Sequence, residues 1–262
     1  MSQPKPKSSK TSRSKPDEAA EPKDGTQPAD GEDGASGSSR LWREWVKPFL
    51  MVLLVVCSLR SAVADWNDVP TGSMRPTILE GERIFVNKLA YDLKVPFTKV
   101  RLMEWGDPQR GDVVVLYSPA DGKRLVKRVI GLPGDELSLR ANRLYVNDQP
   151  AEWEPFADSD RTALGLDGEP RERVLWETLG PMTHPVTFNA YYGSERSTTG
   201  PMMVPDACYF VMGDNRDNSR DSRWFGCVDR ELIVGRALAV VVSLNPEHSY
   251  SPRWDRFFLG LP

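Results

Sequence analysis

After residue 65 the sequence is a series of short β-branched and aromatic runs, separated by glycine, proline, asparagine and aspartate. Runs of this length and composition are typical of β-strands, and their close spacing is typical of a sandwich or barrel. No long amphipathic helical stretch stands out between them. We therefore expect a mainly β fold, with strands at 83–86, 112–117, 143–146, 209–212 and 233–244.

The β pattern is interrupted once. Residues 150–204 are irregular and rich in Glu, Pro, Gly and Thr, which predicts an inserted β subdomain. The surrounding β core is expected over 66–149 and 205–245, and a C-terminal tail over 246–262. The apolar residues of this tail either enter a membrane interface or close the β core; they are Trp254, Phe257, Phe258, Leu259 and Leu261.

The first 40 residues differ from the rest. They carry 7 basic and 7 acidic side chains and only five apolar residues, which cannot bury enough surface to offset chain entropy. We expect a disordered tail over 1–40. The whole chain has 34 Lys+Arg and 37 Asp+Glu, a net charge of -3. Because nucleic-acid binders usually carry a basic surplus, we expect no nucleic-acid partner.

An apolar run at 49–59 follows this tail. A cleavable secretory signal would lie nearer the N-terminus. A buried core helix of 11 to 14 residues is possible, but the run is apolar on all faces and sits beside the polar tail. We expect a single transmembrane helix that anchors the chain over 41–65, with tryptophans at its interfaces. Arg40, Arg43 and Lys47 precede the run, whereas Asp65 and Asp68 follow it. The positive-inside rule then predicts a cytoplasmic N-terminus and a C-terminal domain across the membrane.

Cysteine and histidine are scarce. The chain has three cysteines and two histidines, with no C-x-x-C and no Cys/His cluster, so we expect neither a metal site nor a cofactor. Cys208 and Cys227 flank a turn-rich segment. They could pair in an oxidising compartment or remain free thiols, and the sequence leaves both possibilities open.

One serine stands on a constrained turn. Residues 69–77 read V-P-T-G-S-M-R-P-T, and the two prolines fix the chain on either side of Ser73. An ordinary turn serine and a nucleophile both fit this pattern. A Ser-His-Asp triad is poorly supported, because the sequence has no G-x-S-x-G elbow and both histidines lie in irregular or terminal segments.

A lysine could serve as the base instead. In the strand-like run R-L-V-K-R-V-I-G at 124–131, alternation puts Lys127 and Arg128 on opposite faces, so one of the two points inward. Burial would lower the pKa of a lysine toward the range of a useful base. Alternation does not say which of the two is buried, and both could be solvated on an edge strand.

A polar segment at 213–223, G-D-N-R-D-N-S-R-D-S-R, is rich in residues that bond to backbone. Its three arginines would repel a metal ion, and the spacing of a calcium loop is absent. The composition fits a loop that internal Asp–Arg pairs hold in place and that supports a site.

Together these segments resemble the bacterial type I signal peptidases, which are membrane-bound Ser/Lys proteases that remove leader peptides. The similarity runs from the apolar segment to about Leu244. The matching motifs are P-T-G-S-M-R-P-T around Ser73, R-G-D-V-V-V at 110–115, K-R-V-I-G-L-P-G-D at 127–135, and the polar segment 213–223. The resemblance implies that Ser73 is the nucleophile and Lys127 its general base.

The resemblance also assigns supporting roles. Thr71, where many relatives have serine, would form the oxyanion hole together with the backbone N–H of Ser73. Ser219 would orient the lysine ammonium, and Asp221 and Arg223 would form a supporting ion pair. The residues that would line shallow pockets for small substrate side chains are Val69, Met74, Ile78, Leu125 and Val126; relatives often carry an aromatic residue at the Leu125 position.

We therefore expect a serine endopeptidase in the inner (plasma) membrane, with its catalytic domain on the extracytoplasmic side. It would remove N-terminal signal peptides from exported preproteins after small residues of the Ala-x-Ala type, so its partners would be signal peptides and the lipid bilayer. One rival is another Ser/Lys protease, related to self-cleaving repressors or conjugation-specific peptidases. The alternative of another class is a non-catalytic membrane-anchored β-domain that binds envelope components, with Ser73 and Lys127 apart in space.

Overall fold

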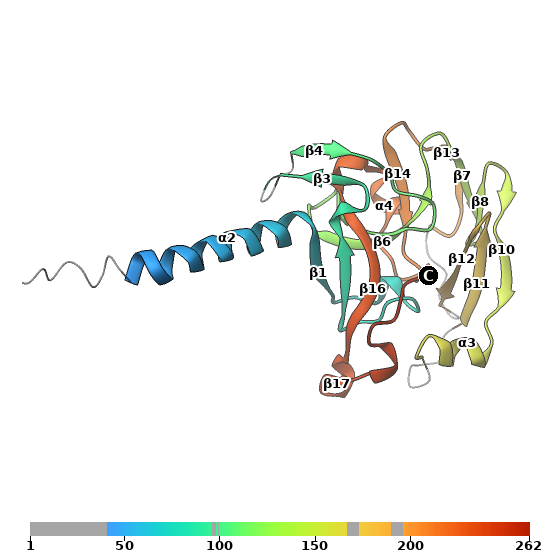
Figure 1. Cartoon of the computed structure of the whole chain (residues 1–262). Coiled ribbons are helices and arrows are strands. Elements are labelled where there is room, and N and C mark those ends of the chain that lie inside the picture. Colours follow the sequence, from blue (N-terminus) through green and yellow to red (C-terminus); the bar gives the residue numbers. More distant parts are fainter. Residues whose placement is uncertain (1–40, 96–97, 99, 167–172, 190–195) are drawn as a thin grey trace, which may run out of the picture. The chain divides into compact units, whose positions relative to one another are not determined.

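The computed structural model describes residues 41–95, 98, 100–166, 173–189 and 196–262 (Figure 1). The disordered tail expected over 1–40 lies outside these residues, as do parts of the expected subdomain. The chain divides into two compact units, Met1–Phe49 and Leu50–Pro262. The second unit contains all of the β structure in the described residues.

The residues before the β structure are helical. Trp42–Val46 forms a π-helix, and α2 (Lys47–Ala62) follows it directly. Apolar side chains of α2 such as Met51, Val52 and Leu54 are exposed. In the part of the chain that the structure describes, no helix is both long and apolar enough to cross a membrane, so the transmembrane helix expected over 41–65 is not found.

The largest sheet has eight strands, all paired antiparallel. Their order is β1-β2-β16-β5-β6-β14-β15, and β17 pairs with β16. The mainly β fold is thus confirmed. The strand bounds are β1 (Ala64–Val69), β2 (Glu82–Asn87), β5 (Val113–Tyr117), β6 (Arg124–Gly131), β14 (Cys208–Met212), β15 (Val228–Asp229), β16 (Ile233–Asn245) and β17 (Ser251–Pro252).

Within the described residues, three smaller sheets complete the β structure, in the orders β13-β7-β8-β9, β10-β11-β12 and β3-β4. In Figure 1, β7, β8, β10, β11 and β12 lie on the side of the fold away from β1. Their bounds are β3 (Asp92–Lys94), β4 (Arg101–Glu104), β7 (Glu136–Arg140), β8 (Arg143–Val146), β9 (Gln149–Pro150), β10 (Glu152–Pro155), β11 (Arg173–Leu179), β12 (Met182–Phe188) and β13 (Thr199–Met203).

Short helices connect the strands. Two are α-helical, α3 (Asp158–Ala163) and α4 (Ser222–Phe225). The others are single 3-10 turns: η2 (Gly72–Met74), η3 (Lys88–Ala90), η4 (Arg230–Leu232), η5 (Pro246–His248) and η6 (Trp254–Arg256).

Both faces of the main sheet are packed, which explains why β5 is a continuous apolar run. Val113 and Val115 join one buried cluster, and Val114 and Leu116 join another. Successive side chains of a strand point to opposite faces, so a strand covered on both sides needs apolar residues at every position. β6 is packed in the same way, because Val126 belongs to the first cluster and Val129 to the second.

The C-terminal tail closes the β core in part. Leu259 and Leu261 pack against the first cluster, and the fully buried Arg256 makes an ion pair with Glu82 of β2. Trp254 is exposed, as is Phe258.

Cys208 and Cys227 form a disulfide. The bond closes the loop that contains the whole polar segment 213–223. Of the two possibilities that the sequence left open, the structure therefore shows the pairing of Cys208 with Cys227.

Residues of the expected inserted subdomain pair through their backbone with the rest of the fold. β13 pairs with β7, and Thr187 of β12 forms a parallel bridge with Asn215. The edge of the three-stranded sheet therefore meets the polar segment directly.

Candidate active site

Ser73 stands in the middle of the 3-10 turn η2, just after β1. The backbone enters the turn extended at Thr71, and the amide of Arg75 closes it by donating to the carbonyl of Gly72 at 3.1 Å. Met74 is fully buried, whereas Ser73 is half-buried. The apolar side chain next to Ser73 thus holds the turn on the core and leaves the serine hydroxyl at its surface.

The side chain of Lys127, in β6, reaches this hydroxyl. Lys127 Nζ donates to Ser73 Oγ at 2.6 Å and to the carbonyl oxygen of Val126 at 2.8 Å. Lys127 is only 2% exposed. A hydroxyl and a buried amine in direct contact are the pieces that a Ser/Lys hydrolase needs.

Burial controls the ionisation of Lys127. It lowers the pKa of the ammonium from 10.5 to about 8, because the charged form loses its hydration. The carboxylates of Asp221 and Asp214 oppose this shift and the Arg223 guanidinium adds to it. Both carboxylates are bound to arginines, Asp214 to Arg128 and Asp221 to Arg223. Roughly a tenth of the lysine is therefore neutral at pH 7.

Arg128, on the opposite face of β6, is also fully buried. Its Nε donates to Asp214 Oδ1 at 2.9 Å, and one terminal nitrogen donates to Oδ2 at 2.8 Å. The expectation that only one of Lys127 and Arg128 points inward is wrong. The reason is that apolar clusters cover both faces of β6, one containing Val126 and the other Val129.

The expected ion pair within the polar segment forms. Arg223 donates to both carboxylate oxygens of Asp221, each at 2.8 Å, and both side chains are fully buried. Asp221 Oδ2 also accepts from the backbone N–H of Gly213 at 3.0 Å. Burial raises the pKa of Asp221, but the hydrogen bond and charge of Arg223 outweigh it and hold that pKa below its usual value.

Gly213 brings the segment close to Ser73. A Cβ at this position would lie 2.3 Å from the Ser73 carbonyl oxygen and 2.3 Å from Ser219 Oγ, so only glycine fits. The hydroxyl of Ser219 is buried but makes no hydrogen bond of ordinary geometry within the described residues. The contact expected between Ser219 and the lysine ammonium is thus not formed, and the orienting role of Ser219 stays a prediction.

Asn215 holds the serine turn, which sequence reasoning missed. Its backbone N–H donates to the carbonyl of Ser73 at 3.1 Å, and its side-chain Nδ2 donates to the carbonyl of Gly72 at 3.1 Å. Asn215 lies in a polar loop in which nothing distinguishes it from Asn218. Only the tertiary contact reveals its role.

A second buried cluster lies behind Asn215. Arg216 donates to both carboxylate oxygens of Glu177, which lies in β11. The side chains of Arg216, Glu177 and the neighbouring His184 are all fully buried. His184 Nε2 lies 3.4 Å from an Arg216 nitrogen. Burial, with the charges of Arg128 and Arg216, holds the pKa of His184 well below its usual value, so the ring is neutral. The available sequence signal was a glutamate within the β run R-V-L-W-E-T-L.

The residues expected to line substrate pockets fall into two groups. Val69, Met74, Ile78 and Val126 belong to the apolar cluster around Ser73, whereas Leu125 packs against the cluster on the other face. Met74 and Ile78 are fully buried, so they can form only the floor of a pocket. Thr71 is exposed beside Ser73.

Comparison with known proteins shows the family of the chain. A model of the family described as signal peptidase, peptidase S26, matches residues 42–242. A signal peptidase I of Pseudomonas fluorescens is 36% identical over 228 residues, which cover 81% of this chain and 77% of that protein. A signal peptidase I of Pseudomonas aeruginosa is 36% identical over 229 residues, with coverage of 81% and 77%.

Among solved structures, a signal peptidase I from Enterococcus faecalis matches with a TM-score of 0.30 and 29% identity, covering 50% of this chain and 96% of that chain. The chain belongs to the signal peptidase family, peptidase S26. The resemblance to type I signal peptidases is thereby confirmed.

Proposed function

We propose that the protein is a membrane-anchored serine endopeptidase that removes N-terminal signal peptides from exported preproteins, after small residues of the Ala-x-Ala type. Ser73 is the nucleophile and Lys127 the general base. The observation that carries the proposal is the 2.6 Å contact between Lys127 Nζ and Ser73 Oγ, made by a lysine with a pKa of about 8.

The chemistry uses the neutral amine. Lys127 Nζ accepts the proton of the Ser73 hydroxyl while Oγ attacks the scissile carbonyl carbon. The ammonium then gives this proton to the leaving nitrogen as the C–N bond breaks, which leaves an ester on Ser73. Water attacks the ester with Lys127 again as base, and the signal peptide leaves as a carboxylate. Thr71 Oγ1 and the Ser73 N–H would donate to the tetrahedral oxyanion; losing one such donor typically raises the barrier by about 2.7–4 kcal/mol.

Two open strand edges flank this site and favour an extended substrate. β1 is the outermost strand of the main sheet. β14 pairs with β6 only at Arg128, Val129 and Gly131, so residues 124–127 have no strand partner on that edge within the described residues. A peptide that adds as a strand presents alternate side chains to the surface below it. Here that surface contains Val69 and Val126, which suit small side chains.

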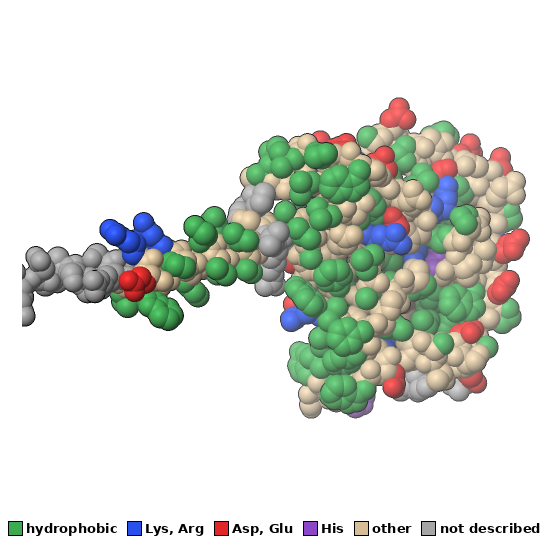
Figure 2. All heavy atoms as spheres, in the orientation of Figure 1, with side chains coloured by type: hydrophobic (Ala, Val, Ile, Leu, Met, Phe, Trp, Pro, Cys, Tyr) green, Lys and Arg blue, Asp and Glu red, His purple; other side chains and the backbone are tan. Residues whose placement is uncertain are grey.

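We also propose that α2 and the residues before it anchor the chain in the inner (plasma) membrane, with the N-terminus cytoplasmic and the catalytic domain extracytoplasmic. Exposed apolar side chains along α2 (Figure 2) and the basic residues before it support this. The full chain should stay with membranes during washing in alkaline carbonate. Release in that wash would identify a peripheral protein and contradict the anchor.

Cleavage by the purified full-length chain tests the proposed reaction. The wild type should cut a preprotein after an Ala-x-Ala leader, and Ser73→Ala and Lys127→Ala should each lower the rate at least about a thousandfold. Lys123→Ala is the matched control, because the Lys123 side chain is 77% exposed and should leave the rate unchanged. Near wild-type cleavage by a folded Ser73→Ala or Lys127→Ala variant would contradict the dyad. A wild type that binds the preprotein without cutting it would favour a non-catalytic domain.

A further inference from the structure

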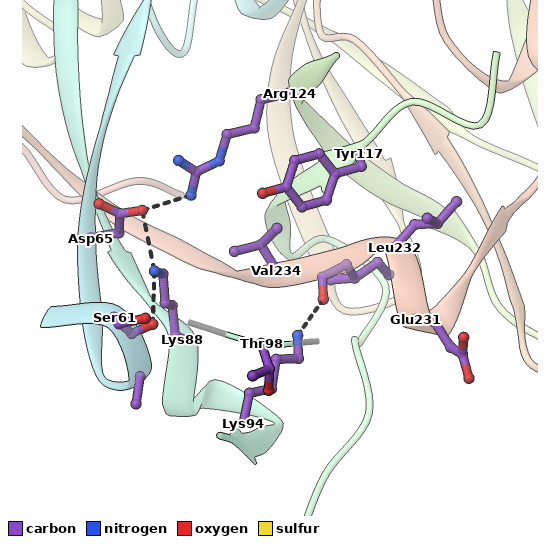
Figure 3. Close-up of a pocket in the computed structure, with 12 residues that line it drawn as sticks. Ser61, Asp65, Lys88, Lys94, Thr98, Tyr117, Arg124, Glu231, Leu232 and Val234 are labelled. Atoms are coloured by element: carbon purple, nitrogen blue, oxygen red, sulfur yellow. Dashed lines mark hydrogen bonds and ion pairs between the residues drawn. The ribbon is translucent and has the colours of Figure 1, made fainter. Parts of the chain in front are cut away.

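A cavity of about 400 Å³ lies at the far end of β1 from the serine turn (Figure 3). The end of α2, β1 and β6 contribute Ser61, Asp65 and Arg124 to its lining, and β3, β5 and the start of β16 contribute further residues. β1 and β6 are also the strands whose open edges flank Ser73 and Lys127. The cavity therefore lies at one end of the space between the edges of β1 and β6, here called the groove, in which we propose that an extended substrate binds.

Positive charge is in excess in this cavity. Its lining holds three cations, Lys88, Lys94 and Arg124, and two carboxylates, Asp65 and Glu231. Figure 3 shows one carboxylate shared by two cations: Asp65 Oδ2 accepts from Arg124 at 2.8 Å and lies 3.3 Å from Lys88 Nζ.

Asp65 stays ionised in this setting. Burial raises the pKa of its carboxyl, but the hydrogen bond from Arg124 and the charges of Lys88 and Arg124 outweigh burial and hold that pKa below its usual value. One carboxylate thus faces two cations. An acidic side chain that entered the cavity would supply the missing negative charge.

The Asp65–Arg124 pair spans the groove. Two strands that flank a third strand lie roughly 10 Å apart, a distance that an arginine and an aspartate side chain together can bridge. Arg124 is three positions before Lys127 in β6, and so lies about 10 Å along the strand from it. The end of α2 lines the same cavity, so this end of the groove faces the proposed anchor. A signal peptide would place its membrane-side, upstream residues there.

We propose that this cavity is a specificity pocket for an acidic side chain at the fourth or fifth substrate residue before the scissile bond, with Arg124 as its main recognition group. The incoming carboxylate replaces part of the contact between Asp65 and Arg124 and is also within reach of Lys88. The proposal rests on the proposed function and deepens it.

A set of matched substrates tests the pocket. Preproteins that differ only by Glu, Ala or Lys at these two positions are cut by the full-length wild type, and kcat/KM is compared. We expect Glu to exceed Lys by about fivefold, the range of a partly exposed ion pair. Arg124→Glu should abolish or reverse this preference. Lys123→Glu, which makes the same change in charge one residue away on an exposed side chain, should keep it.

Each outcome separates the two proposals. Equal rates for Glu and Lys with the wild type, or the same preference in Arg124→Glu as in the wild type, would overturn the pocket while cleavage itself stands. Loss of the preference in Lys123→Glu as well would show a long-range field in place of a pocket, and would also overturn it. Failure of the wild type to cut even the Ala substrate would instead sink the proposed function.

Discussion

Lys127 and Arg128 are adjacent on β6, and the fold surrounds their side chains with different partners. Arg128 donates to both carboxylate oxygens of Asp214 in a bidentate ion pair within the core. Lys127 donates to the Ser73 hydroxyl and to a backbone carbonyl, and burial lowers its pKa to about 8. Only lysine can become neutral in this range, because arginine keeps its proton in proteins. Burial is therefore the main cause that makes Lys127 able to accept a proton, and the pairing of Asp214 and Asp221 with arginines leaves it no counterion of its own among the described residues.

At the scale of secondary-structure elements, the polar segment 213–223 connects the serine turn with the sheet of β10, β11 and β12. Asn215 donates to the backbone of the serine turn, and Arg216 donates both to the carbonyl of Thr187 and to Glu177. The residues of the expected insertion therefore support the segment that holds Ser73. A substitution in β11 should therefore alter the position of the serine turn through these hydrogen bonds.

Glu177→Gln tests this connection. Removing the carboxylate leaves Arg216 buried without its counterion, so the free energy of unfolding should fall by about 3–5 kcal/mol. In the variant that remains folded, kcat should fall more than KM changes, because the serine turn is displaced. Chemical unfolding and steady-state cleavage measure the two effects.

Glu152→Gln is the control for this variant, since Glu152 is an exposed residue of the neighbouring strand β10 and its loss should change stability by no more than about 0.5 kcal/mol. Equal stability of the two variants would show that the Glu177–Arg216 pair does not support the fold.

Sequence pattern predicted the elements with strong β composition. The runs expected at 83–86, 112–117, 143–146, 209–212 and 233–244 all form strands. The pattern could not predict two-residue strands such as β15 and β17. Such short strands are defined by pairing with a neighbouring strand and have no distinctive composition. The strands within 150–204 were also missed individually. Their buried glutamate is stabilised by a tertiary ion pair with Arg216, and their buried histidine lies against the same pair; no local pattern contains these contacts.

For the whole molecule, the sequence identified Ser73 and Lys127 as candidate residues but did not predict the contacts that hold them. Ser73 and Lys127 were identified by resemblance, and the structure brings them into contact. Residue pattern alone left Lys127 and Arg128 equivalent, because alternation assumes one solvated face and this sheet is packed on both. The disulfide between Cys208 and Cys227 and the ion pair between Arg256 and Glu82 join segments distant in sequence. Contacts of that kind arise only from the complete fold.

The pH dependence of kcat/KM tests the central claim, that Lys127 acts as a general base for Ser73, most directly. This parameter reports the ionisation of the free enzyme, and only the neutral amine can accept the proton. With a pKa of about 8, the neutral fraction falls as pH falls, so kcat/KM should level off above pH 8 and decline about tenfold per pH unit below it. If Lys127 is the base, kcat/KM at pH 6 should be about a hundredfold below its plateau value. A profile that stays level from pH 5 to pH 9 would contradict that role.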